Sequence, residues 1–470
     1  MHEDSFSPMA RRTMLSRAAL GIGSIAFSSL LADSAPTRAS ESEVLIPRPS
    51  HFAPKAKRVI QFFCNGGPSH VDTFDPKPML QKYAGQPVPN NLLTERKTGA
   101  AFPSPFSFKQ YGQSGLPISE LFARTAEHAD DMAIIRSMYA QVPNHEPSLL
   151  LMNCGDSVQP RPSMGSWLLY GLGTENQNLP GFVAMSPGGL PIKDNENWQS
   201  AFLPGALQGT FVDSQHREIE KLMENINNRY TTSRSQRKQL DLLRALHDEH
   251  HAGRPDPRLD ARMQSFELAY RMQMEAGDAF DLGQEPSWIR EAYTDTVHGR
   301  QTLIARRLIE RGVRFVQLWH GAGQPWDNHT QVESNHRKLA QETDQPIAAL
   351  ISDLKSRGLF EETLVIWGGE FGRTPTVELD GAGNSQLGRD HNHYGFTVWL
   401  AGGGIKGGTI RGATDEFGFA AQENKTSVHD LHATILHLMG LDHKRLTYRY
   451  AGRDFRLTDV HGSVLTDILA

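Results

Sequence analysis

Cysteine is scarce in this chain of 470 residues, in which Cys64 and Cys154 are the two present. Two cysteines exclude a disulfide framework, and their separation lacks the spacing of a cysteine metal site. They therefore say little about the redox compartment. The length, in contrast, is informative, because it suits one large α/β domain with insertions better than a small module.

A strong charge of one sign is also missing. The formal net charge is -5, and the lysines and arginines form no basic stripe. Proteins that bind nucleic acid present such a stripe, together with a recognisable groove-reading module. Neither feature is seen in the sequence, so we expect no nucleic acid among the partners.

The apolar stretch near the N-terminus is too short to be an ordinary membrane span. It runs from Ala18 to Ala32 and is rich in Gly, Ser and Ala, whereas a spanning helix needs roughly 20 apolar residues. Arg11 and Arg12 precede it, and small residues lead to Ala39. This pattern is typical of a twin-arginine signal peptide, residues 1–39. It predicts export to the periplasm or cell envelope, with no stable membrane span after cleavage.

Short apolar runs in the remaining chain predict buried strands. Each is apolar on both faces and ends at a glycine or a polar group, as strands of a parallel sheet do. The runs cover residues 58–64, 131–139, 313–323, 363–373 and 396–408. A helical pattern precedes the run at 363–373, with apolar residues at helix spacing from Leu339 to Leu354 and a stop at Gly358.

Residues 213–311 differ from this pattern. They are charged, carry Leu and Met at helical spacing, and show no strand signal. We interpret them as a helical insertion within a single domain, residues 40–470. The predicted fold class is α/β, with a mixed, mostly parallel central sheet flanked by helices.

Several of the twenty histidines stand beside acidic residues in Gly-rich stretches that follow the predicted strands. The carboxyl ends of strands in such a sheet meet at one edge, where ligands bind. Acidic side chains gathered there repel one another unless a cation neutralises them. A divalent metal (Zn, Ca, Mn or Mg), or two, is therefore expected at this edge. The residues placed there are Asn65, His70, Asp72, His320, Asp327, His329, Glu370, Arg373, Asp390, His391 and His393.

Several of these residues also have a structural interpretation. Glu370 and Arg373 could form an ion pair that holds their loop. Asp72 could be an Asx-turn residue, and His393 could be a surface or supporting group. By contrast, the histidines between Ser427 and Leu441 lie in an amphipathic helical pattern, so we assign them structural roles.

The segments "GGPSHVDTFDP", "WDNH", "GGEFGRTP", "GRDHNHYG" and "AGGGIKGG", in this order behind the leader, resemble the domain of unknown function 1501 family, which is abundant in planctomycetes. That family is placed with the alkaline phosphatase and sulfatase superfamily. The resemblance implies an alkaline-phosphatase-like fold, a metal site at the strand ends, and hydrolysis of phosphate or sulfate esters.

The resemblance also implies a metal-ligand set. Glu370 stands where the superfamily has the acid of an Asp-His or Asp-Asn pair. Asp327 and His329 match a shortened Asp-x-x-x-His element, and His391 matches the later metal histidine. The first-strand aspartate falls on Asn65, so Asp72 is expected to take over its role.

The position of the nucleophile departs from the superfamily pattern. The segment "HEPSLLLMNCG" keeps Pro147, Ser148 and Gly155 of the sulfatase motif, but His145 replaces its cysteine and Leu149 its arginine. A formylglycine sulfatase is thereby disfavoured. His145 could attack phosphorus or act as the base for water, or it could be a further metal ligand. Ser148 is a second candidate nucleophile, although it could equally be a helix cap.

Two functions remain open from the sequence. The first is an exported metal-dependent hydrolase of a small-molecule or polysaccharide phosphate or sulfate ester, in which Arg373 stabilises the charge of the anion. The second is a non-catalytic, metal-bearing binding or envelope-assembly protein with the same fold, which the altered nucleophile segment would favour.

Overall fold

The five predicted apolar runs form neighbouring strands of one sheet. The computed structural model describes residues 45–470 except 90–91, 224–225, 227–229 and 255, so the predicted signal peptide lies outside the described residues. Each strand is buried along most of its length, as expected for a sheet covered on both faces. The strands are β1 (Arg58–Phe63), β5 (Met132–Tyr139), β8 (Phe315–Trp319), β9 (Thr363–Gly368) and β13 (Phe396–Ala401).

The sheet is mixed, and the predicted α/β class is confirmed. Its order is β14-β5-β13-β9-β1-β8-β6-β7, and β17 also pairs with β5. β13 runs antiparallel to both of its neighbours, whereas the other pairs are parallel. Consequently β1, β5, β8 and β9 all end at the same edge. The strands of this sheet that the sequence did not reveal are β6 (Phe182–Ser186), β7 (Thr210–Asp213), β14 (Thr409–Arg411) and β17 (Thr426–Ser427).

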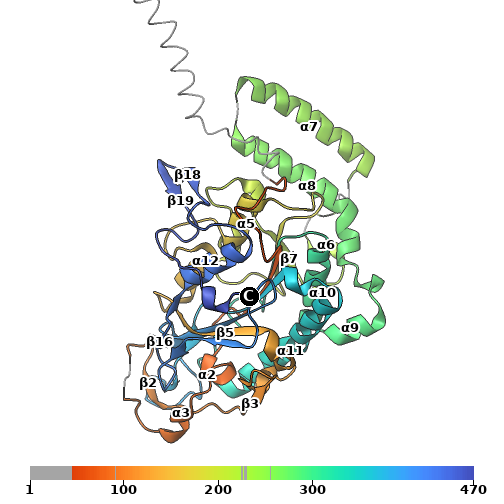
Figure 1. Cartoon of the computed structure of the whole chain (residues 1–470). Helices are drawn as coiled ribbons and strands as arrows, with labels where there is room; N and C mark the ends of the chain where they lie inside the picture. The colour runs from red at the N-terminus through yellow and green to blue at the C-terminus, as the bar shows by residue number, and fades with distance from the viewer. Residues whose placement is uncertain (1–44, 90–91, 224–225, 227–229, 255) are drawn as a thin grey trace, which may run out of the picture.

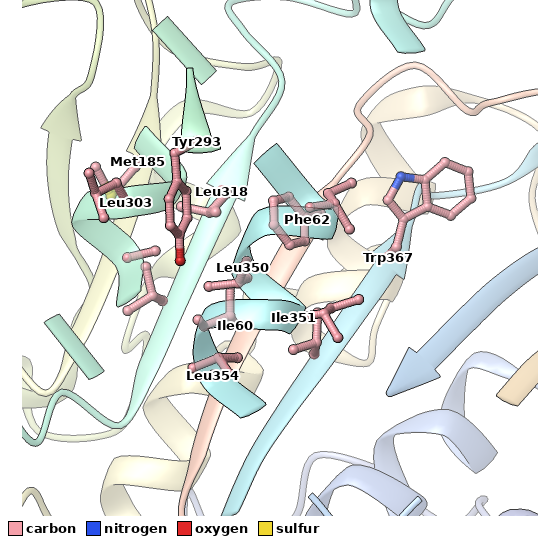
Figure 2. Close-up of a cluster of buried hydrophobic side chains, with 14 of the residues drawn as sticks. Ile60, Phe62, Met185, Tyr293, Leu303, Leu318, Leu350, Ile351, Leu354 and Trp367 are labelled. Atoms are coloured by element: carbon pink, nitrogen blue, oxygen red, sulfur yellow. The ribbon is translucent and has the colours of Figure 1, made fainter. Parts of the chain in front are cut away.

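Alternation along β1 divides the hydrophobic core into two layers. Ile60 and Phe62 belong to the layer that also contains Leu350 and Leu354 of α11 (Val332–Ser356). Figure 2 shows these side chains between the strand and the helix. The next residue in the alternation, Phe63, faces the opposite layer. Successive strand residues point to opposite faces, so a strand in a covered sheet must be apolar on both.

The second layer packs α4, α5 (Met164–Leu172) and α12 against the sheet. α4 (His145–Cys154) ends at Gly155, whose φ of 73° is left-handed and whose added Cβ would lie 2.1 Å from a neighbouring backbone oxygen. α12 (Val428–Leu438) begins with a capping box between Ser427 and Asp430. Its His429 and His432 contact backbone carbonyl oxygens at 3.0 and 2.8 Å, which gives these two histidines structural roles.

Helices occupy most of the stretch from Asp213 to Arg311. α7 (Ser233–Gly253) and α8 (Pro257–Phe280) extend away from the sheet (Figure 1), whereas α10 (Val297–Glu310) packs directly on β8. The last helix of the predicted insertion therefore belongs to the layer that covers the sheet. No helix in the described part of the chain combines the length and apolar character needed to cross a membrane.

Shorter helices and strands lie around the carboxyl edge of the sheet and at the periphery of the domain. They are α2 (His70–Thr73), α3 (Pro78–Lys82), β2 (Thr98–Ala101), β3 (Phe108–Tyr111), β4 (Leu116–Ser119), α5 (Met164–Leu172), α6 (Ile219–Leu222), α9 (Ser287–Tyr293), β10 (Gly372–Arg373), β11 (Thr376–Glu378), β12 (His391–Asn392), β15 (Ala413–Thr414), β16 (Ala421–Glu423), β18 (Tyr448–Tyr450) and β19 (Arg453–Phe455). Of these, β10 and β12 form a two-stranded ribbon in which Arg373 lies opposite His391.

Candidate active site

Three imidazoles converge on one carboxylate oxygen beyond the ends of β5 and β8. The Nε2 atoms of His145, His329 and His391 lie 3.3, 2.9 and 3.1 Å from Oδ1 of Asp327. His145 begins α4, Asp327 and His329 lie in the loop between β8 and α11, and His391 lies on β12. Segments far apart in sequence thus meet at one point, as the sequence predicted for Asp327, His329 and His391.

Each of these imidazoles is held from behind by a glutamate. In every case the Nδ1 atom contacts a glutamate oxygen, which leaves Nε2 to face the centre. Such a contact fixes the tautomer and the orientation of the ring, and it is the usual support of a metal-binding histidine. The pairs are His145 with Glu370 at 2.7 Å, His329 with Glu378 at 2.5 Å, and His391 with Glu95 at 2.7 Å.

The charges of the cluster shift the pKa values of its members. Burial lowers the pKa of His145, but Asp327 and Glu370 outweigh burial and raise it to about 9. Burial also opposes ionisation of Asp327, yet the three imidazoles and Arg373 hold the pKa of its carboxyl well below the usual range. For His391 burial dominates and lowers the pKa to about 3. Asp327 is therefore ionised at pH 7 and balanced by positive charge on its neighbours.

Unsatisfied nitrogen atoms test whether this cluster suits a metal. Within the described residues, the buried Nε2 atoms of His145 and His329 have no aligned hydrogen bond, although Asp327 is close to both. Buried polar atoms are normally satisfied, so such atoms call for a further partner. Imidazole nitrogens and a carboxylate oxygen are donors that bind Zn²⁺ and similar divalent ions. The residues present therefore fit a divalent cation.

Arg373 is part of the scaffold of the site. Its guanidinium is fully buried, donates to the carbonyl oxygens of Gly66 and Gly67, and lies 2.6 Å from Oδ1 of Asp327. Arg373 therefore pairs with the Asp327 carboxylate. The Glu370 carboxylate has a different partner and accepts a hydrogen bond from the N–H of Gly66 at 2.9 Å. The Glu370–Arg373 ion pair considered from the sequence is thus replaced by an Arg373–Asp327 pair.

The turn after β1 brings backbone close to the cluster. Gly66 has a φ of 111°, and a Cβ added there would lie 2.4 Å from the backbone nitrogen of Asp327. Only glycine adopts this conformation without strain, and only glycine leaves room for the Asp327 loop. The glycine pair that follows the first strand in the sequence therefore permits the close approach on which the site depends.

Asp72 and Ser148 are engaged elsewhere. Both oxygens of the buried Asp72 carboxylate pair with Arg389, at 2.7 and 3.1 Å, so Asp72 faces this arginine and not the imidazoles. The Ser148 hydroxyl lies inside α4 and donates to the carbonyl oxygen of Val142 at 2.8 Å. Neither contact is that of a metal ligand or of a nucleophile activated by a base.

The predicted supporting residues fall into two groups. Asn65 stabilises the loop after β8, because its amide contacts the backbone of His320, Gly321 and Gly323. Asp390, buried beside His329 with 4.0 Å between Oδ1 and Nδ1, is the supporting residue next to the cluster. The remaining three have other partners: His70 contacts the carbonyl oxygen of Gly418, His320 contacts Glu342, and His393 packs on Tyr394.

Sequence reasoning missed two of the supporting glutamates. Glu95 lies in the loop before β2, and Glu378 closes β11. Neither follows a strand of the central sheet, so the rule that located the other residues did not reach them. The short charged segment "TERK" around Glu95 was the available signal, but nothing in it indicates proximity to His391.

A family model described as protein of unknown function (DUF1501) matches residues 56–469. Similar solved structures include the PsFucS1 sulfatase from Pseudoalteromonas sp., at 12% identity and a TM-score of 0.36, covering 82% of this chain and 68% of that chain. A protein in the alkaline phosphatase superfamily from Vibrio parahaemolyticus has 11% identity and a TM-score of 0.37, covering 91% and 74%. The phosphonate monoester hydrolase of Agrobacterium radiobacter has 11% identity and a TM-score of 0.33, covering 83% and 74%. No curated protein matches the chain.

Proposed function

This chain belongs to the DUF1501 family, and we propose that it is an exported metal-dependent hydrolase of phosphate or sulfate esters. The observation that carries the proposal is the convergence of three glutamate-supported imidazoles on Asp327. Export rests on the predicted twin-arginine signal, and the ester class rests on the resemblance to the alkaline phosphatase and sulfatase superfamily.

Asp327, His329 and His391 are the residues we assign to the metal. When bound there, a divalent cation would polarise the ester oxygens and neutralise developing negative charge. Glu378 and Glu95 keep the Nε2 lone pairs of His329 and His391 directed at the centre. Arg373 holds Asp327 in place from the buried side.

His145 is assigned a different role, as the base that accepts a proton from attacking water. Without a metal its pKa of about 9 keeps the imidazole protonated at pH 7. A cation bound to Asp327 would offset part of the negative charge that raises this pKa, so that Nε2 could accept the proton. Nδ1 of His145 faces the carboxylate of Glu370, which is fully buried. Such a carboxylate orients the ring and stabilises the imidazolium that forms when Nε2 takes the proton. Direct attack by Nε2 on the ester is the alternative that the sequence left open.

The N-terminus of α4 favours an anionic substrate. α4 begins at His145, and its N-cap residue Asn144 makes no side-chain capping hydrogen bond. The first N–H groups of a helix carry partial positive charge and have no partner within the helix, so this end attracts anions. A phosphate or sulfate ester next to His145 would meet this favourable charge.

Turnover tests this proposal directly. Chelator-treated protein is assayed with aryl phosphate and aryl sulfate after addition of Zn, Mn, Ca or Mg, in wild type and in a His145→Ala variant. We expect metal-dependent hydrolysis by the wild type, and loss of turnover with retention of the metal in the variant. Wild type that binds metal without hydrolysing either ester would favour the second candidate, a non-catalytic metal-bearing protein, which the unusual residues His145 and Leu149 also support.

A further inference from the structure

A second group of metal-type donors lies on the face of the sheet covered by α10 and α11. His298 comes from α10, His320 follows β8, and Glu342 comes from α11. The Nε2 atoms of His320 and His298 lie 2.9 and 3.7 Å from the same Glu342 oxygen, Oε2. The centroids of the two imidazole rings are 4.4 Å apart. Three separate elements thus direct two imidazole nitrogens and one carboxylate oxygen at a common point.

The tautomer of His298 is set by Gln301. The Gln301 amide nitrogen donates to the carbonyl oxygens of Met185 and Trp319, at 2.9 and 3.1 Å, so its oxygen is left as an acceptor. That oxygen lies 3.2 Å from Nδ1 of His298, which must therefore carry the hydrogen. A neutral His298 then directs the lone pair of Nε2 at the Glu342 carboxylate.

Two acceptors that face each other repel unless a hydrogen-bond donor or a cation lies between them. Protonation of Nε2 is one remedy, but His298 is only 9% exposed, and burial disfavours an imidazolium. A bridging water that donates to both acceptors is a second remedy, and a divalent ion is a third. Two imidazole nitrogens and a carboxylate oxygen are donors that zinc binds.

We propose that His298, His320 and Glu342 bind a second divalent cation of the zinc type. The ion joins α10, α11 and the loop after β8. His320 is also tied to Asn65, whose side-chain oxygen accepts from the His320 N–H at 3.1 Å and whose carbonyl oxygen accepts from the Trp326 N–H at 3.0 Å. Fixing His320 therefore fixes the loop that ends at Asp327. This role is structural and does not depend on the proposed hydrolase activity.

The ordinary alternative is a hydrogen-bonded network without metal, in which His320 donates to Glu342. Zinc stoichiometry separates the two. Full-length chelator-treated protein is loaded with Zn²⁺, desalted and subjected to elemental analysis, as wild type and as the variants Glu342→Gln, Asp327→Asn and the double variant. Glu333→Gln, at an exposed position in the first turn of α11, is the matched control.

We expect two zinc equivalents in wild type and in Glu333→Gln, one in each single variant, and none in the double variant. If Glu342→Gln retains everything that wild type binds, the second site does not exist. If Asp327→Asn loses nothing while Glu342→Gln loses one equivalent, the proposed function fails and the second site stands. If Glu342→Gln does not fold, His298→Gln replaces it, with the same expected loss of one equivalent.

Discussion

Replacing the supporting glutamates one at a time separates the metal-holding imidazoles from the proposed base. Glu378→Gln and Glu95→Gln alter the partners of His329 and His391, whereas Glu370→Gln alters the partner of His145. Each substitution keeps the size of the side chain but removes the negative charge that orients the imidazole. An imidazole that binds metal should then lose metal affinity, whereas an imidazole that acts as the base should lose turnover.

The structure sets the order of the effects. Glu378 is 6% exposed and lies 2.5 Å from His329, so its loss should weaken metal affinity about 10–100-fold, or about 1.4–2.8 kcal/mol. Glu95 is 34% exposed and solvent screens its charge, so Glu95→Gln should weaken metal affinity by less than about tenfold. Glu370 supports the base, so Glu370→Gln should lower turnover about 10²–10⁴-fold with little change in metal affinity.

Metal affinity is measured by competition with a chromophoric chelator, and turnover is measured at saturating metal. Glu361→Gln, an exposed position before β9 at the opposite edge of the sheet, is the control and should change neither quantity. A Glu370→Gln variant that loses as much metal affinity as Glu378→Gln would show that His145 is a metal donor. If none of the three glutamate variants changes the metal affinity, the assignment of the metal site is refuted.

Two further predictions concern the scaffold. Gly66→Ala should destabilise the fold by about 1–3 kcal/mol and abolish metal binding, because a Cβ at a φ of 111° is strained and collides with the Asp327 backbone; an unchanged melting temperature would contradict this. Glu285 pairs with the buried Arg306 and Arg307, and although burial opposes its ionisation, the arginines lower its pKa below the ordinary 4.5. Its stabilising contribution is therefore complete above about pH 4.5 and is lost as pH falls through the lowered pKa. Glu285→Gln should cost about 3 kcal/mol at pH 7 in denaturant unfolding, and the difference from wild type should shrink in acid; a pH-independent difference would contradict it.

The sequence located those parts of the site that obey a local rule. Asp327, His329 and His391 were identified because polar residues that follow buried strands meet at one edge of a sheet. Glu370 was expected at that edge as a metal ligand, but its carboxylate contacts Nδ1 of His145 and the N–H of Gly66, and the sequence does not reveal these contacts. The role of a side chain depends on its partner, and His145 and Glu370 are 225 positions apart.

The misplaced residue and the missed strands have equally physical causes. Asp72 was expected to bind metal, but Arg389, which is 317 residues away, neutralises it. The strand β6 was overlooked because its five residues include Ala184 and Ser186 and one β-branched residue, Val183, so its local preference is weak. Its pairing with β8 and β7, which depends on the rest of the fold, defines it as a strand.

The most direct test of the central claim is a metal titration of chelator-treated protein with ester hydrolysis as the readout. In wild type, turnover of aryl phosphate or aryl sulfate should rise in proportion to the cation bound at Asp327. In Asp327→Asn, that cation should not bind and turnover should stay at the background rate. Full hydrolysis by metal-free protein, or an Asp327→Asn variant as active as wild type, would contradict the claim that these imidazoles and Asp327 form a metal-dependent active site.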